Sequence, residues 1–235
     1  MPTLNDIIWA AQTYENTNYN SSYLTIMRQD AFLTSLRNAP DDLQIDDIRD
    51  ILIKFLNKWL CRLRNYDDIT ASNLKNCLVD VYQDLVAVQG FSILNFQNEN
   101  NNERIERIFN RFWLYGSTIA KNFGPTCTSK VLHIINPALF TMWDDAIRTN
   151  YWLNNRDVID SGRGYYNFLI EIKHIAESLV NEFEQLHLDQ DFNLWLSLEL
   201  DIDPPLSLVK LIDEYNFLTY TKGLTRPQNW INPLL

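Results

Sequence analysis

Apolar residues recur at steps of three and four along most of this chain, which is the spacing of one face of an α-helix. The clearest stripe lies between residues 48 and 63. Its members are Ile48, Ile51, Leu52, Phe55, Leu56, Trp59, Leu60 and Leu63. Asp46 and Asp47 precede most of it, and negative charge is favourable at a helix N-terminus. The pattern therefore predicts a helix over 48–63 with one broad buried face.

Four more apolar stripes predict further helices. One covers about 71–88 and is expected to end at the glycine that follows it, because glycine commonly comes after the last helical turn. Two others cover about 103–121 and 168–183. In the fourth, Asp203 and Pro204 are expected to begin the helix, since proline suits the first helical position.

Two segments follow the alternating pattern of a strand. The first is 192–200, where every second residue is Phe or Leu, and 91–96 could supply its partner. Both segments also fit buried turns of helix, so both alternatives stay open. The whole pattern favours an all-α, multi-helix globular fold of about ten helices. We expect 1–235 to form a single unit, with two helical lobes, about 1–100 and 101–235, as the alternative division.

The composition is that of a protein with a substantial core, since 46% of the residues are hydrophobic and 13% are aromatic. No apolar run approaches the roughly 20 residues that a membrane span needs. Residues 1–20 lack the basic start and apolar centre of a secretory signal. We therefore expect a cytoplasmic protein with no membrane partner. Cys61, Cys77 and Cys127 are too widely spaced for a disulfide framework or a zinc site, so neither a metal nor another cofactor is expected.

The charge balance weighs against a general nucleic-acid binder. The chain has 20 basic and 30 acidic residues, a net charge of −10. Binding to nucleic acid depends mainly on clustered Lys and Arg. Residues 103–163 differ from the rest, because they carry eight Lys or Arg against six Asp or Glu.

Residues 119–147 carry the most informative motif. A predicted helix ends near Lys121, and a short turn leads into a second helix that begins after Gly124 and stops before Pro137. A tight turn of this kind points backbone N–H groups outward at the start of the second helix, where they can bind an anion. Asp144 and Asp145 follow farther along, where the local alternative is a helix N-cap.

This segment resembles the helix–hairpin–helix DNA glycosylase superfamily. The stretch from Asn122 to Thr128 falls on the hairpin of that family, with Asn122 in place of its first glycine. Asp144, 20 residues after Gly124, falls on the essential aspartate of the family. Thr126 falls where the lyase-competent members carry a nucleophilic lysine, and Lys130 lies one helical turn further on. The cysteines of the iron–sulfur cluster found in many members are absent.

The resemblance implies a monofunctional N-glycosidase. Asp144 would stabilise positive charge on the sugar, and Asn122, Gly124 and Thr126 would contact the backbone phosphate. Asp145 would lie at the pocket, and the base would be sandwiched by aromatic rings. The aromatic candidates are Trp113, Tyr115, Trp143, Trp152, Tyr165 and Tyr166.

Three interpretations stay open at this point. The protein could cleave a base–sugar bond in DNA, or it could act on a free nucleoside or nucleotide. The acidic net charge suits the second, because a small substrate needs no extended basic groove. The third is a non-enzymatic helical binding protein that keeps the helix–hairpin–helix fold. An aromatic-lined cavity beside Asp144 would favour the small substrate, and an Asp144 that only caps a helix would favour the third.

Overall fold

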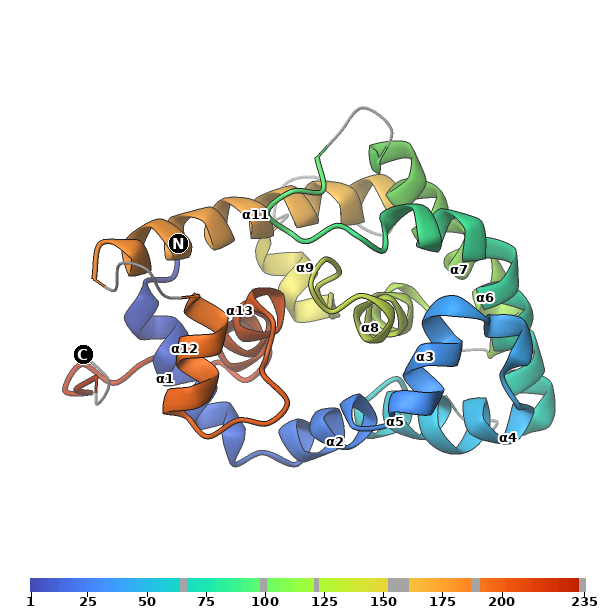
Figure 1. The fold of residues 1–235 in the computed structure, drawn as a ribbon, viewed down its shortest axis with the longest axis horizontal. Helices are drawn as coiled ribbons and strands as arrows, with labels where there is room; N and C mark the ends of the chain where they lie inside the picture. Colours follow the sequence, from blue (N-terminus) through green and yellow to red (C-terminus); the bar gives the residue numbers. More distant parts are fainter. Residues whose placement is uncertain (64–66, 98–100, 121–122, 152–160, 187–190, 233–235) are drawn as a thin grey trace.

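The computed structural model describes residues 1–63, 67–97, 101–120, 123–151, 161–186 and 191–232. These residues form helices joined by turns and loops, and no strand occurs among them (Figure 1). The all-α, multi-helix prediction is therefore confirmed. None of the helices in these ranges is long and apolar enough to cross a membrane.

The first half of the chain contains six helices in the described ranges. They are α1 (Leu4–Glu15), α2 (Asn18–Met27), α3 (Asp30–Asn38), α4 (Ile45–Asp47), α5 (Lys54–Lys58) and α6 (Asp68–Val88). A π-helical segment, Ile48–Ile53, joins α4 to α5 with helical backbone angles throughout the junctions. A 3₁₀ turn, Pro40–Asp42, precedes α4.

The second half supplies the helices that build the site. They are α7 (Asn101–Ile119), α8 (Pro125–Ile135), α9 (Asp145–Tyr151), α11 (Gly162–Glu184), α12 (Phe192–Glu199) and α13 (Leu208–Asn216). A π-helical turn, Phe217–Thr221, follows α13 directly. Thus the helices predicted over about 71–88, 103–121 and 168–183 are confirmed as α6, α7 and α11, and α11 begins earlier than predicted, at Gly162.

The predicted helix over 48–63 ends early. Helical structure stops at Lys58, and Leu60 and Arg62 adopt left-handed backbone angles, with φ of 66° and 53°. The Leu63 N–H donates to the Asn57 side chain at 2.7 Å, which holds this turn against the helix end. The apolar stripe extends beyond the end of the helix because Leu63 is buried although it lies in the turn and not in a helix.

The structure decides the alternatives left open for 192–200 and 91–96, and it corrects the start of the last predicted helix. The segment 192–200 is helical rather than a strand, with the Asp191 side chain accepting from the Leu194 N–H at 2.8 Å. Its apolar residues are dense enough to fit both the alternation of a strand and the spacing of a helix. Leu194 is half exposed in the helix. The segment 91–96 forms turns, not a partner strand. The last long helix begins at Leu208 instead of Pro204, because Ser207 is its N-cap.

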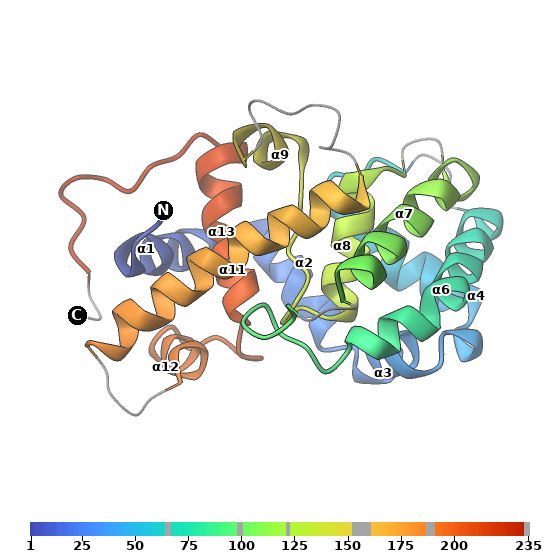
Figure 2. The ribbon, with the colours of Figure 1, turned by 90° about the horizontal axis from the view of Figure 1, so that it is seen from above.

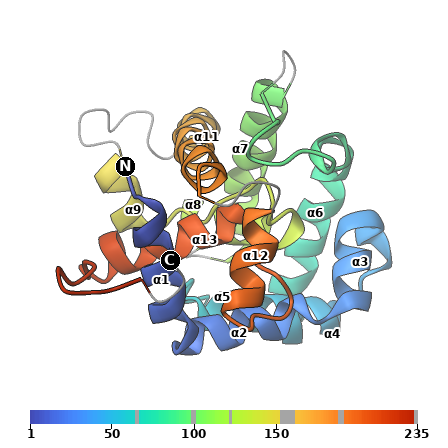
Figure 3. The same cartoon turned by 60° about the vertical axis from the view of Figure 1, so that its left-hand side comes forward.

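The helices are arranged in three layers around α8 and α13. α11 crosses one side and packs on α7 and α13, whereas α2 and α5 lie on the opposite side (Figures 1 and 3). α7 also packs along α6, and α8 lies beneath α7 and α11 in the view from above (Figure 2). Buried residues from both sides of residue 100 belong to one hydrophobic core. The alternative division into lobes 1–100 and 101–235 stays a prediction.

Candidate active site

The predicted hairpin falls between α7, which ends at Ile119, and α8, which begins at Pro125. Pro125 is the first residue of α8 and Gly124 is its N-cap, with extended backbone angles of φ −127° and ψ −165°. Gly124 therefore does not adopt a left-handed conformation. The glycine that the turn does need is Gly116 on α7, because a Cβ there would lie 2.3 Å from the Phe123 carbonyl oxygen. Asn122 lies outside the described residues.

α8 fixes the segment that carries Asp144. The Trp143 N–H donates to Ser129 Oγ on α8 at 2.9 Å, directly before Asp144. Asp144 is the residue before α9, and its Oδ1 accepts from the Ile147 N–H at 2.9 Å. Its Oδ2 accepts from Thr221 Oγ1 at 2.6 Å. The carboxylate thus caps α9 with one oxygen and meets a second element with the other.

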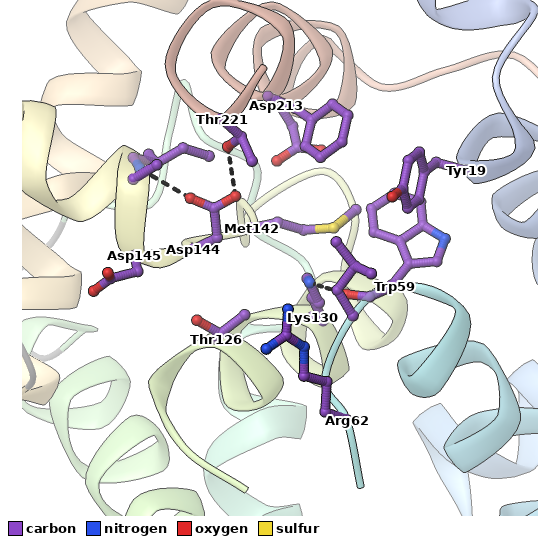
Figure 4. Close-up of a pocket in the computed structure, with 14 residues that line it drawn as sticks. Tyr19, Trp59, Arg62, Thr126, Lys130, Met142, Asp144, Asp145, Asp213 and Thr221 are labelled. Carbon is purple, nitrogen blue, oxygen red and sulfur yellow. Dashed lines mark hydrogen bonds between the residues drawn. The ribbon is translucent and has the colours of Figure 1, made fainter. Parts of the chain in front are cut away.

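Asp144 also lines a cavity of about 380 Å³ (Figure 4). Its walls come from α2, the turn after α5, α8, the segment 142–147, α13 and the turn after it. The lining residues are Tyr19, Trp59, Leu60, Arg62, Thr126, Lys130, Met142, Asp144, Asp145, Ala146, Ile147, Asp213, Phe217 and Thr221. Elements distant in sequence therefore meet at the predicted aspartate.

One side of the cavity is an aromatic wall formed by Tyr19, Trp59 and Phe217. The Tyr19 ring lies edge-on to both others, with ring centroids 6.2 Å from Trp59 and 5.1 Å from Phe217. Figure 4 shows Tyr19 and Trp59 across the cavity from Asp144. The Lys130 ammonium, which also lines the cavity, donates a hydrogen bond to the Trp59 carbonyl oxygen. The Lys130 ammonium thus lies beside the aromatic wall, 6.0 Å from the centre of the Trp59 ring.

A buried charged cluster lies on α13, and one of its three members, Asp213, lines the cavity. Lys210 Nζ lies 2.9 Å from a Glu214 oxygen and 3.8 Å from an Asp213 oxygen, and all three side chains are at most 3% exposed. The ammonium is also 4.2 Å from the centre of the Tyr14 ring. Burial raises the pKa of Asp213 to about 7 although Lys210 opposes the rise, and the carboxylates of Glu214 and Asp144 add to it.

Sequence reasoning missed this cluster, although a signal was present. Lys210, Asp213 and Glu214 stand at positions i, i+3 and i+4, so they share one face of a helix that is otherwise largely apolar. Charged residues are rarely buried unless they are paired. A charged triplet within an apolar helix therefore indicates an internal ion pair or a site, and here Lys210 pairs with Glu214 while Asp213 lines the cavity.

The residues expected from the resemblance are brought together only in part. Thr126, Asp144 and Asp145 line the cavity. Thr126 Oγ1 accepts from Arg148 at 3.1 Å, and Arg148 pairs with the exposed Asp145 at 3.1 Å. Gly124 is the N-cap of α8 and is not among the lining residues.

The aromatic residues expected at the pocket lie elsewhere. Trp143 and Tyr165 are fully buried in the core, where Trp143 stacks on Phe168 with ring centroids 5.6 Å apart. Trp113 is 45% exposed on α7. Tyr115 and Tyr166 pack against the core and do not line the cavity, and Trp152 lies outside the described residues. The aromatic wall is supplied instead by the N-terminal part of the chain and by Phe217.

The residues that the structure describes hold no group of three or more His, Cys, Asp or Glu side chains placed to bind a metal. The likeness to the glycosylases rests on residues 119–147. No protein-family model, no curated protein and no solved structure matches the chain.

Proposed function

We propose that the protein hydrolyses the N-glycosidic bond of a nucleoside or nucleotide, with Asp144 as the catalytic carboxylate. The main support is the position of Asp144 in the wall of a cavity that also has an aromatic side. Ligand pockets commonly have volumes of about 300–1,000 Å³, and this cavity of about 380 Å³ lies at the small end of that range. It suits one base and one sugar.

The chemistry assigned to Asp144 is electrostatic. When a base–sugar bond breaks, positive charge develops on the sugar ring, and a fixed carboxylate beside the ring lowers the energy of that state. The Thr221 hydroxyl and the Ile147 N–H hold the two oxygens of Asp144. Because the group is already oriented, little energy is needed to reorganise it during the reaction. The same carboxylate can orient the attacking water.

The opposite wall suits the base. Tyr19 and Trp59 present aromatic surface, and Met142 adds a polarisable apolar side chain. Flat heterocycles pack well on such surfaces, and enzymes that act on a base hold it in a pocket of this kind. The base would lie toward Tyr19 and Trp59, with the sugar toward Asp144.

A small substrate is favoured over DNA. The net charge of −10 opposes the approach of a polyanion, and affinity for DNA depends on neutralising several phosphates with basic residues. A single nucleotide carries its charge in one place, and Arg62 and Lys130 bring positive charge to the cavity. DNA is therefore included in the experiment as the competing substrate.

No lyase step is expected. A Schiff base requires a neutral amine, and Thr126 offers only a hydroxyl at the position where the lyase-competent members carry lysine. Lys130 lies in the cavity, but its ammonium donates to the Trp59 carbonyl oxygen. The products should be a free base and a free sugar, with no covalent adduct.

Base release measured by liquid chromatography tests the proposal. The panel contains nucleosides, their 5′-monophosphates and duplex DNA with damaged bases, each with wild type, Asp144→Asn and Asp191→Asn. Asp191 is the matched control, because it also caps a helix with one carboxylate oxygen, but it precedes α12 and does not line the cavity. Wild type and Asp191→Asn should release a base from a nucleoside or nucleotide, and Asp144→Asn should be about 10²–10³-fold slower.

Four results would contradict the proposal. Equal rates for wild type and Asp144→Asn would remove Asp144 from the chemistry. Release from DNA alone would overturn the small-substrate assignment, and an adduct trapped by borohydride would overturn the monofunctional one. Absence of release from every substrate would favour the non-enzymatic binding protein. The bond from the Ile147 N–H to Asp144 is the observation that fits that alternative, since capping alone explains one oxygen of the carboxylate.

A further inference from the structure

Asp213 is the second carboxyl group in the cavity wall. It lies on α13, a helix whose other residues are mostly buried, and its side chain is 3% exposed. In Figure 4 the Asp213 side chain lies next to Thr221, with Asp144 on one side of it and Tyr19 on the other. The two carboxyl groups therefore face one space from different elements.

The two groups have different surroundings. Asp144 accepts hydrogen bonds from the Thr221 hydroxyl and from the Ile147 N–H. Asp213 is buried, and the nearby ammonium of Lys210 is closer to Glu214, at 2.9 Å against 3.8 Å. Glu214 thus takes the close ion pair, and Asp213 keeps the more distant one.

Other titratable groups also face Asp213 from the elements packed around it. They are Tyr14 on α1, Tyr23 on α2, Lys130 on α8, Asp144 before α9, Tyr165 on α11, and Lys210 and Glu214 on α13 itself. The two lysines favour the charged carboxylate, whereas burial and the other two carboxylates favour the protonated acid. The outcome is a pKa of about 7, so a large share of Asp213 is protonated at neutral pH.

Two carboxyl groups with different surroundings in one site commonly take different roles in acid–base catalysis. We infer that Asp213 is the catalytic acid that protonates the leaving base, while Asp144 stabilises the sugar. This inference rests on the proposed N-glycosidase function. It gives Asp213 a role in proton transfer in addition to its ion pair with Lys210.

The step balances as follows in atoms and charge. The bond from the sugar carbon to the base nitrogen breaks, and its electron pair goes to the base. The Asp213 proton is transferred to a ring nitrogen of the base, which leaves as a neutral molecule. The oxygen of one water bonds to the sugar carbon, and the proton that this water loses returns Asp213 to its acid form. The sum is nucleoside plus water giving base plus sugar.

The test compares two leaving groups. One substrate is the nucleoside or nucleotide that wild type hydrolyses fastest, and the other is 4-nitrophenyl riboside, whose leaving group departs as an anion and needs no proton. Asp213→Asn should hydrolyse the nucleoside about 10²–10⁴-fold more slowly. Its rate on the nitrophenyl riboside should stay within about threefold of wild type. An equal loss on both substrates, or no loss on either, would overturn the inference.

The pH profile of the wild-type protein gives a second test that needs no variant. For the nucleoside, kcat/KM should fall as the pH rises through about 7, because Asp213 loses the proton that it must donate. The nitrophenyl riboside should lack that fall. Profiles with the same basic limb for both substrates, or with none for the nucleoside, would overturn the inference. A wild-type protein inactive on both substrates would refute the proposed function itself, which separates the two failures.

Discussion

Ionising Asp213 should destabilise the folded protein as the pH rises. In the unfolded chain this carboxyl group has its ordinary pKa of 3.8, whereas burial raises its pKa to about 7 in the fold. Between these values the folded protein holds a proton that the unfolded chain has released. The free energy of unfolding therefore falls with increasing pH. The stabilisation that comes from protonated Asp213 is complete below about pH 4 and is lost as the pH rises through about 7.

The size of the effect follows from the two pKa values. Each pH unit between them changes the free energy of unfolding by about 1.4 kcal/mol. The full contribution is then about 4 kcal/mol, of which about 3 kcal/mol should be lost between pH 5 and pH 8. Such a loss is a large part of the stability of an ordinary domain.

Urea unfolding of wild type and Asp213→Asn from pH 5 to pH 8 measures this contribution. Relative to the variant, wild type should lose about 3 kcal/mol over that range, because asparagine does not titrate. Asp84→Asn is the control, since the Arg107 guanidinium lowers the pKa of Asp84 and its difference from wild type should be flat above pH 5. A flat difference for Asp213→Asn, or one of opposite slope, would refute the assigned environment.

Two further predictions concern packing and the charged cluster. Gly116→Ala should destabilise the protein by about 1–3 kcal/mol, because the new Cβ would press on the Phe123 carbonyl. Gly90→Ala is the control, since a Cβ at Gly90 meets open space. Equal urea midpoints for the two variants would contradict this prediction. Lys210→Met should lower the free energy of unfolding by about 3–5 kcal/mol at pH 8, because it leaves buried carboxylates without their cation. The loss should be smaller at pH 5. A loss in urea unfolding that does not change with pH would contradict the pairing.

The helices and the position of Asp144 could be predicted from the sequence, whereas most of the cavity could not. Apolar spacing within one helix is a local property, so α6, α7 and α11 were predictable. The aromatic wall joins Tyr19 and Trp59, which come together only through the packing of α2 against α5.

The position of Asp213 shows the same limit. Its spacing from Lys210 predicts that the two share a helix face, but the element that covers this face is set by tertiary structure. The early end of α5 likewise depends on left-handed Leu60 and Arg62, residue types for which such angles are uncommon. No local pattern of polar and apolar positions encodes that turn.

Binding of a charged sugar mimic tests the central claim most directly, namely that Asp144 stabilises positive charge on a sugar in this cavity. The ligand is a nucleoside analogue with a protonated iminoribitol ring, and its affinity is measured by calorimetry at neutral pH. Wild type should bind it at least about 10²-fold more tightly than the parent nucleoside, as transition-state mimics do. Asp144→Asn should lose most of that advantage, and Asp191→Asn should keep it. Equal affinity of wild type and Asp144→Asn for the cation, or no binding by wild type, would contradict the account.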